Sequence, residues 1–290
     1  MRTTHGHLRR LAGALALCSI LAGATAAQAA VGALRLSEGA TLSSPVDAAF
    51  HDVGEDGLTI EGWFYLDRVP DVGQVQTFFA HSASYALGVG IARGRELDEF
   101  YDPTQARAFI GVAAEGWGVQ GQHWFPPESG RNAPVGEWFH VALQFHAEPP
   151  TGVAVYLAGY GGGPLAGDFP FTLGGDAAAL DIGTASAQLG IGGFDVEPDT
   201  TITRLLGLVD EVRVSNVARY EGREAIAPRS FVPDEHTVAL WTFDGDRPYA
   251  DSSGAGHHLM HTGTITVEPL AVRARDKLTT TWAQLRSVGH

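Results

Sequence analysis

Short runs in which apolar and polar residues alternate recur along most of this chain, and they restrict its fold more than any other feature. Alternation with a period of two is the pattern of a β-strand with one buried face. Glycine (37 residues) and proline (15 residues) fall between the runs rather than inside helical stripes. The spacing predicts an all-β fold of two antiparallel sheets, a β-sandwich or jelly roll. The predicted strands are residues 33–36, 58–66, 77–82, 85–91, 106–113, 138–145, 153–159, 189–193, 206–214 and 237–244.

Two of these runs indicate which face is buried. In residues 58–66 the even-numbered positions are apolar or glycine, whereas Glu61 and Trp63 belong to the opposite face. In residues 138–145 the odd-numbered positions are Phe, Val or Leu, and His140 lies on the other, polar face. We expect His140 to make a structural hydrogen bond. Residues 216–226 are the one stretch that predicts a short helix.

The first 29 residues have the pattern of a secretory signal peptide. Arg9 and Arg10 precede an apolar run, residues 11–22, that is too short to span a bilayer, and the small residues before position 30 suit cleavage after Ala29. Cys18 would leave with the signal, so the mature chain would contain no cysteine. We expect an exported protein, secreted or at the periplasm or cell surface. Residues 30–267 would form one domain with a closing hairpin at 237–267, and residues 268–290 a tail.

The charge of the chain argues against several classes of partner. Without its signal it carries 16 basic and 33 acidic residues, a net charge of 16 − 33 = −17. Such a surface repels nucleic acid and anionic lipid. No later segment is apolar for long enough to cross a membrane. Cations and neutral glycans remain compatible with this composition.

Four phrases in order carry a resemblance to a known family: "LTIEGWFYLDRVP", "GEWFHVALQFHAEPPTGVAVYLAGYGGGP", "LGIGGF" and "LLGLVDEVRVSNVARY". Together they resemble the laminin-G-like, or concanavalin A-like, jelly-roll domains of bacterial exported proteins, over residues 31–243. The resemblance implies a β-sandwich and a non-catalytic recognition module that binds carbohydrate or a glycosylated surface partner. The alternative is a structural or adhesive module that binds protein and no sugar.

Asp210 stands out in the strand at residues 206–214. If Leu208 and Val212 point into a core, the alternation places the Asp210 carboxylate in the same row. A carboxylate there needs backbone N–H groups, a cation such as Arg213 or Arg204, or a metal. The resemblance to β-sandwich glucanases and lectins implies one structural calcium near this strand. Its predicted ligands are Asp210, Glu38 and the carbonyl of Gly39, with Asp244, Asp246 or Asp251 as further candidates from the closing hairpin.

Signals for catalysis are incomplete. Glycosidases of the resembled fold carry an E-x-D-x-E motif, or a form of it that is one residue longer, on one strand. Glu96 and Asp98 begin such a motif. Phe100 and Tyr101 occupy the two places where its third acid would stand. We therefore predict no enzymatic activity and no catalytic residue; a glycoside hydrolase is the less favoured alternative, and it would require Glu96 and Asp98 to face a cleft. The histidines at positions 257, 258 and 261 are interpreted as an exposed polar turn rather than a transition-metal site.

Large aromatic residues outside the core pattern occur in "EGWGVQGQHWFPPESG", residues 115–130. Sugar rings stack on exposed aromatic faces while polar side chains bind their hydroxyl groups. Trp117, Trp124, Gln122 and His123 are therefore the predicted ligand-binding residues. The alternative is that these aromatics cover an edge of the sandwich.

Overall fold

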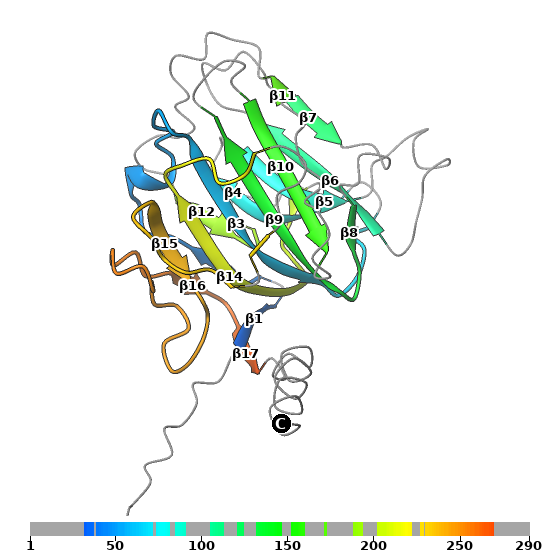
Figure 1. Cartoon of the computed structure of the whole chain (residues 1–290). Coiled ribbons are helices and arrows are strands. Elements are labelled where there is room, and N and C mark those ends of the chain that lie inside the picture. The colour runs from blue at the N-terminus through cyan, green and yellow to red at the C-terminus, as the bar shows by residue number, and fades with distance from the viewer. Residues whose placement is uncertain are drawn as a thin grey trace, which may run out of the picture.

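The structure is a computed structural model that describes residues 32–37, 39–71, 74–81, 85–90, 105–112, 121–124, 132–146, 152–159, 171–172, 188–193, 202–221, 227–228 and 230–269. These residues form two sheets that pack face to face (Figure 1). All strand pairs are antiparallel except the short pairing of β13 with β4. The fold class predicted from the alternation is therefore confirmed.

The first sheet, sheet A, has eight strands. Their order is β11 (Phe171–Thr172), β10 (Gly152–Gly159), β9 (Trp138–Phe145), β3 (Leu58–Leu66), β14 (Gly207–Ser215), β1 (Gly32–Leu36) and β17 (Ile265–Pro269), with β15 (Thr237–Trp241) also paired to β14.

The second sheet, sheet B, has nine strands. Their order is β16 (Met260–Thr262), β2 (Thr41–Ser43), β12 (Leu189–Ile191), β4 (Val75–His81), β5 (Tyr85–Gly90), β6 (Gln105–Val112) and β7 (Gly121–Trp124), with β13 (Ile202–Thr203) beside β4 and β8 (Asn132–Pro134) beside β6. A 3-10 turn, η1 (Ala48–Phe50), follows β2.

The core lies between the sheets, where the alternating pattern placed it. Leu58, Ile60 and Phe64 of β3 face the interior together with the odd-numbered residues of β9. The Phe64 ring packs against Phe78 and Phe79 of β4, with ring centroids 4.7 and 5.3 Å apart. All these side chains have no exposed surface or almost none, so burial of apolar area is the main source of stability for the sandwich.

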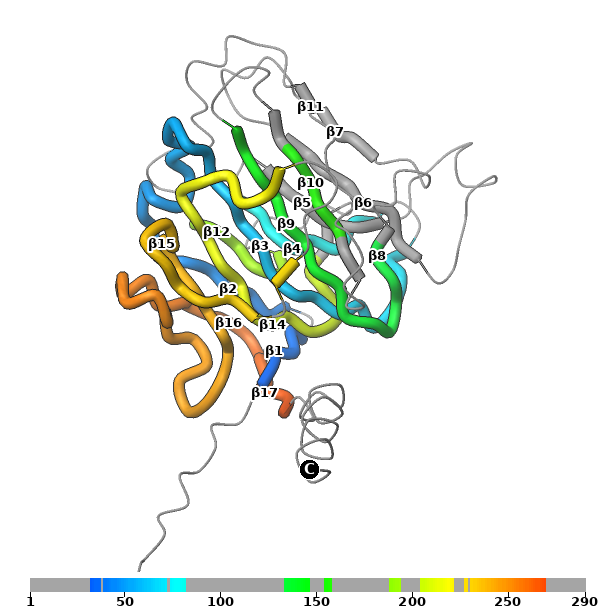
Figure 2. Tube along the Cα trace, in the orientation of Figure 1, coloured from blue at the N-terminus to red at the C-terminus, as the bar shows by residue number. Residues whose placement is uncertain are grey.

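The C-terminal strands complete both sheets. β15 pairs with β14, β16 pairs with β2, and β17 pairs with β1 along the whole length of both strands. Figure 2 shows the blue start of β1 beside the red-orange β17. Residues 237–267, predicted as a closing hairpin, thus supply three separate strands. β17 also continues to Pro269, two residues beyond the predicted end of the domain.

A β-bulge in the middle of β14 changes which residues face the core. The register against β3 shifts between Asp210 and Val212, and Glu211 has a left-handed backbone with φ of 47°. Leu205 and Val209 face the core before the bulge, and Val212 and Val214 face it afterwards. The premise that Asp210 shares a face with the core residues is therefore wrong, because the extra residue at the bulge shifts the alternation.

Candidate functional site

Part of the outer face of sheet A is covered by the chain that follows β14, and an extensive polar network lies between the two. We name residues 216–234 the strap; residues 222–226 and 229 of it lie outside the described part. Residues 216–221 are irregular, so the predicted helix does not form there. Beneath the strap is a second apolar cluster. It comprises Trp63, Ala142, Ala154, Tyr156 and Leu240 from the sheet, and Tyr220, Ala227 and Phe231 from the strap.

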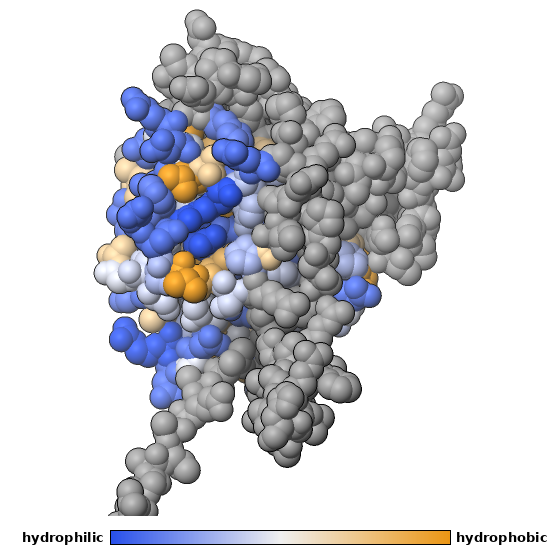
Figure 3. Space-filling view, in the orientation of Figure 1, coloured by the Kyte–Doolittle hydropathy of each residue, from blue (hydrophilic) through white to orange (hydrophobic). Residues whose placement is uncertain are grey.

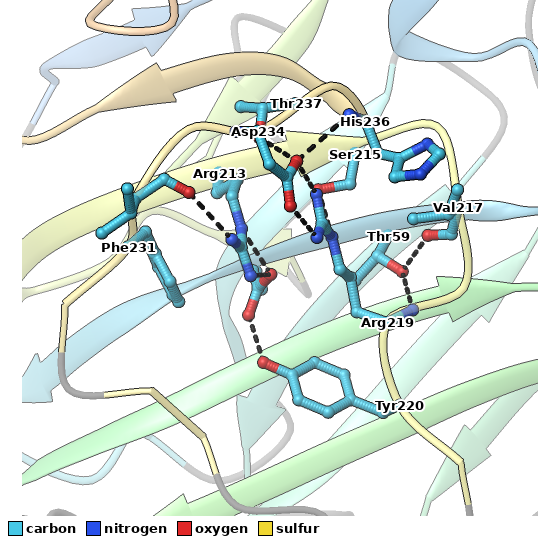
Figure 4. A network of polar contacts seen from close by, with 12 residues as sticks. Thr59, Arg213, Ser215, Val217, Arg219, Tyr220, Phe231, Asp234, His236 and Thr237 are labelled. Carbon is cyan, nitrogen blue, oxygen red and sulfur yellow. Dashed lines mark hydrogen bonds and ion pairs between the residues drawn. The ribbon is translucent and has the colours of Figure 1, made fainter.

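Glu61 is the centre of a buried polar network under the strap. Its side chain has no exposed surface. Arg213, the neighbour of Glu61 on β14, donates from Nε and Nη2 to one carboxylate oxygen at 2.9 and 2.7 Å. His140 of β9 lies 3.0 Å from the other oxygen, which also accepts the hydroxyl of Tyr220. Figure 4 shows the side chains of Arg213 and Tyr220 pointing toward one another within this network.

The charges in this network are balanced inside the protein. Burial alone would raise the pKa of Glu61, but its contacts with His140, Arg213 and Tyr220 outweigh burial and hold that pKa below its ordinary value. Burial and the charge of Glu61 raise the pKa of the Tyr220 phenol far above its ordinary value. Glu61 is therefore an anion held by a cation and by hydrogen-bond donors.

The backbone of the strap is pinned to sheet A by amide and hydroxyl side chains. Gln144 of β9 accepts the backbone N–H of Tyr220 at 2.9 Å and donates to its carbonyl at 2.8 Å, as a neighbouring strand would. The Thr59 hydroxyl donates to the carbonyl of Val217 at 2.7 Å. Farther along the strap, the Glu211 carboxylate accepts the backbone N–H of Phe231 at 2.6 Å. These side chains account for backbone polar groups that would otherwise be buried without partners.

An ion pair closes the outer side of the strap. Arg219 donates from both terminal nitrogens to the Asp234 carboxylate at 2.5 and 2.7 Å, and its Nε donates to Ser215 at 2.9 Å. The hydrogen bonds from Arg219 hold the pKa of Asp234 well below its ordinary value. Because the Asp234 side chain is 42% exposed, this ion pair contributes far less stability than the buried one.

The ionisable side chains beneath the strap are not accessible to a substrate. Every oxygen of Glu61 is bonded to a side chain of this protein, and Glu61, His140 and Arg213 lie at or below 7% exposure. What the arrangement does is hold a third layer of chain on sheet A. The outer surface that results is mostly hydrophilic, with small separate apolar patches (Figure 3).

The predicted ligand-binding residues lie on the other sheet. Gln122, His123 and Trp124 belong to β7, which pairs with β6 so that Trp124 is opposite Phe109. Trp117 lies outside the described residues. β7 stands at the end of the strand order of sheet B, at the opposite side from β16. The structure therefore brings three of the four predicted residues to one edge of the sandwich.

The predicted calcium ligands are not brought together. Leu34 is opposite Val209 and Leu36 is opposite Gly207, so Asp210 is level with the start of β1. Gly39 lies beyond the other end of β1, and Glu38 is outside the described residues. Asp210 and Gly39 therefore do not fit one calcium site, and calcium at Asp210 with other oxygen ligands stays a prediction. Among the described residues, no group of three or more His, Cys, Asp or Glu side chains forms a metal-binding cluster.

Asp251 organises the loop that includes the predicted histidine turn. Its carboxylate accepts the backbone N–H groups of Leu240, Ser253 and His257 at 2.8 to 3.0 Å, and also the Ser253 hydroxyl. Burial would raise the pKa of Asp251, but these hydrogen bonds lower it overall. Asp251 therefore holds the backbone of its own loop, and its role as a calcium ligand stays a prediction.

The three histidines of this loop have separate partners. His257 bonds the Val238 carbonyl and the Asp47 carboxylate at 3.0 and 3.2 Å. The His258 ring accepts the backbone N–H of Asp251, and His261 stacks on Tyr249 with centroids 4.4 Å apart. They are not gathered around one point.

Sequence analysis missed the strap network, although it contains two signals for it. Glu61 and Arg213 are charged residues inside strands whose neighbours are apolar, which is unusual unless they are paired. The register shows that they are cross-strand partners. The contribution of Tyr220 had no signal, because its segment resembled a helix.

Comparison with known proteins yields structural neighbours only. No protein-family model and no curated protein matches this chain. A protein of Bacteroides ovatus that is provisionally assigned to carbohydrate binding has a TM-score of 0.49 and 18% identity, over 84% of this chain and 61% of that chain. Domains LG4–5 of the mouse laminin α1 chain have a TM-score of 0.34 and 13% identity, over 71% of this chain and 48% of theirs.

A third neighbour is domain 4 of an extracellular arabinanase of Geobacillus stearothermophilus, solved with arabinotriose, with a TM-score of 0.27 and 18% identity over 59% of this chain and 63% of that chain. Laminin LG domains are thus among the structural neighbours. Among the described residues, no helix is long and apolar enough to span a membrane.

Proposed function

We propose that this chain is an exported, non-catalytic recognition module that binds carbohydrate, free or on a glycosylated partner, at the β7 edge of sheet B. The observation that supports this most is the position of β7. It is the last strand of sheet B and carries Gln122, His123 and Trp124. An aromatic residue with amide and imidazole neighbours is the combination that sugar binding uses.

The packing of the strap on sheet A favours the same location. The outer face of this sheet on β3, β9, β10 and β15 packs against the strap and bonds to it through fully buried side chains, so a ligand there would have to displace the strap. Breaking such a network leaves buried charges without partners, which costs about 3–5 kcal/mol. Sheet B has no equivalent network among the described residues.

A second candidate function has one observation in its favour. Among the described strands β7 pairs with β6 alone, so a partner protein could add a strand to this edge by backbone hydrogen bonds. Such an adhesive module would bind without sugar. Its affinity would depend on the backbone of β7 and little on the side chain of Trp124.

Binding to an array of neutral and acidic glycans tests the proposal and separates it from the alternative. We expect the mature chain to bind at least one glycan, Trp124→Ala and Trp117→Ala to bind at least tenfold more weakly, and Trp124→Phe, which keeps a flat ring, to retain most binding. Repeating the array in calcium and in chelator tests the predicted metal. A wild-type chain that binds no glycan would favour the adhesive function.

A further inference from the structure

One row of side chains on the outer face of sheet A keeps exposed surface beside the strap, although Trp138 at its end packs against the apolar cluster beneath the strap. The register pairs Trp138 with Tyr65, Tyr65 with Leu208, Leu208 with Arg35, and Arg35 with Thr266. Cross-strand partners share a face, so these five side chains cross β9, β3, β14, β1 and β17 in one line. We name them the outer row. At about 4.8 Å between strands it is about 19 Å long.

The outer row is surface, whereas the next row is interior. Trp138 and Tyr65 are partly exposed, the Arg35 side chain is 31% exposed, and Thr266 is exposed. Trp63 and His140, which form the neighbouring cross-strand pair, are at most 3% exposed. Leu208 is the one member of the outer row that is buried.

The two halves of the outer row differ in chemistry. Trp138 and Tyr65 form an aromatic pair with ring centroids 5.8 Å apart and an interplanar angle of 58°. At the other half, Arg35 is hydrogen-bonded to both Asp67 and Glu268, so its guanidinium is fixed in place. Both carboxylates have side chains that are 40% exposed and can accept further hydrogen bonds from outside.

The charge around the outer row selects the kind of ligand. Asp67 and Glu268 together exceed the single positive charge of Arg35, and Glu137, next to Trp138, is also exposed. An anionic ligand is repelled by these three carboxylates. A ligand that stacks on aromatic rings and donates hydroxyl hydrogen bonds to carboxylates is a neutral sugar chain.

We propose that the outer row is a second carbohydrate-binding surface, which takes a neutral oligosaccharide of a few sugar residues lying across the strands. Sugar rings stack on Trp138 and Tyr65, and hydroxyl groups further along bond to Asp67 and Glu268. The surface belongs to sheet A and shares no residue with β7 of sheet B, so it goes beyond the function proposed above.

Affinity electrophoresis in gels that contain a soluble neutral polysaccharide (β-glucan, xylan, mannan or arabinan) tests this surface, with polygalacturonate as the anionic comparison. The variants are Trp138→Ala, Trp138→Phe and Arg35→Ala, together with Trp124→Ala for the β7 edge. Val232→Ser, which changes a side chain that is 72% exposed on the strap, is the control. Melting temperatures report whether each variant is folded.

We expect retardation by at least one neutral polysaccharide, at least a tenfold loss of affinity in Trp138→Ala, a smaller loss in Arg35→Ala, and wild-type behaviour in Trp138→Phe and Val232→Ser. If Trp138→Ala is unfolded, the polysaccharide affinity of Arg35→Ala tests the proposal instead. The proposal is overturned if Trp138→Ala and Arg35→Ala bind like wild type, if polygalacturonate is preferred, or if no neutral polysaccharide binds.

The same gels separate this proposal from the earlier one. If Trp124→Ala loses all binding and Trp138→Ala is unaffected, the β7 site is supported and the outer row is refuted as a binding surface. If Trp138→Ala loses binding and Trp124→Ala is unaffected, the outer row is supported and the β7 site is refuted. If both sites bind, each single variant loses part of the affinity and the double variant loses all of it.

Discussion

Two stretches of the outer face of sheet A differ in exposure: beside and beyond the Glu211 bulge the outer-face side chains of β3, β9 and β14 are interior, whereas two of the three that these strands give to the outer row are partly exposed. Beyond the bulge, Glu61 and Gln144 have no exposed surface because the strap lies over them. Before the bulge, Tyr65 and Trp138 are partly exposed. The same strands thus supply a fixed internal layer at one end and an accessible row at the other.

The difference shows what a polar residue in a strand does in each setting. Under the strap, polar side chains are bonded to the strap backbone or to one another, and each bond serves packing. At the outer row, Arg35 is bonded to Asp67 and to Glu268, and all three side chains keep exposed surface. Polar residues of the same types are therefore structural where the strap buries them, and candidates for binding where they stay exposed.

The largest effect is expected from Glu61→Ala. It leaves Arg213 buried without its counter-ion and removes an acceptor from His140 and Tyr220, so the free energy of unfolding should fall by about 3–5 kcal/mol. Denaturant unfolding of the variant measures this loss. Glu55→Ala, which removes an exposed carboxylate, is the control and should be nearly neutral. A small loss in Glu61→Ala would mean that the network does not hold the strap.

Trp63 and Trp138 compare a buried with a partly exposed position on the outer face of sheet A. Trp63 is 3% exposed and belongs to the cluster under the strap, so Trp63→Ala should lower stability by about 3–5 kcal/mol. Trp138 is partly exposed, and Trp138→Ala should cost about 1–2 kcal/mol, because less apolar surface is lost. Chemical unfolding of both variants tests the order. Equal losses of stability in the two variants would contradict the distinction between a buried and an exposed part of this face.

Acid should remove the stabilising contribution of Glu61. The pKa of Glu61 is lower in the folded protein than its ordinary value, so its stabilising contribution is complete above the unfolded pKa, about 4.3, and is lost as the pH falls through the lower folded pKa. The melting temperature should therefore drop below about pH 4.5, and less steeply in Glu61→Gln. Identical pH profiles for the two proteins would refute this assignment.

The smallest effect is expected at the outer side of the strap. Asp234→Ala removes the partner of Arg219, but this ion pair is exposed on its carboxylate side and should contribute about 0.2–1 kcal/mol. Thermal unfolding at low and at high salt would show a small difference that salt reduces. A loss as large as that of Glu61→Ala would make the outer ion pair, rather than the buried network, the main anchor.

The alternating pattern was sufficient for the fold class, for the ten predicted strands and for the core faces of β3 and β9. It also placed His140 on the outer face, where its hydrogen bond to Glu61 confirms a structural role. Strand alternation follows from backbone geometry, which is local, so these features can be read from short segments.

The errors arose where distant segments decide the structure. Glu211 adopts a left-handed backbone although it is not glycine, so no residue type marked the bulge that moved Asp210 out of the core row. The strap is held by Gln144 and Thr59, which are 76 and 158 residues from their strap partners. The outer row exists only through the register of five strands, which no single segment encodes.

Amide hydrogen exchange in the strap tests the central claim most directly, because both proposed binding surfaces rest on a fixed third layer over sheet A. The N–H groups of Tyr220 and Phe231 are bonded to buried side chains. They should exchange as slowly as the central amides of β3, with opening free energies within about 2 kcal/mol of global unfolding. Exchange as fast as that of the exposed turn at Glu235 would show that the strap opens freely, and would contradict the account.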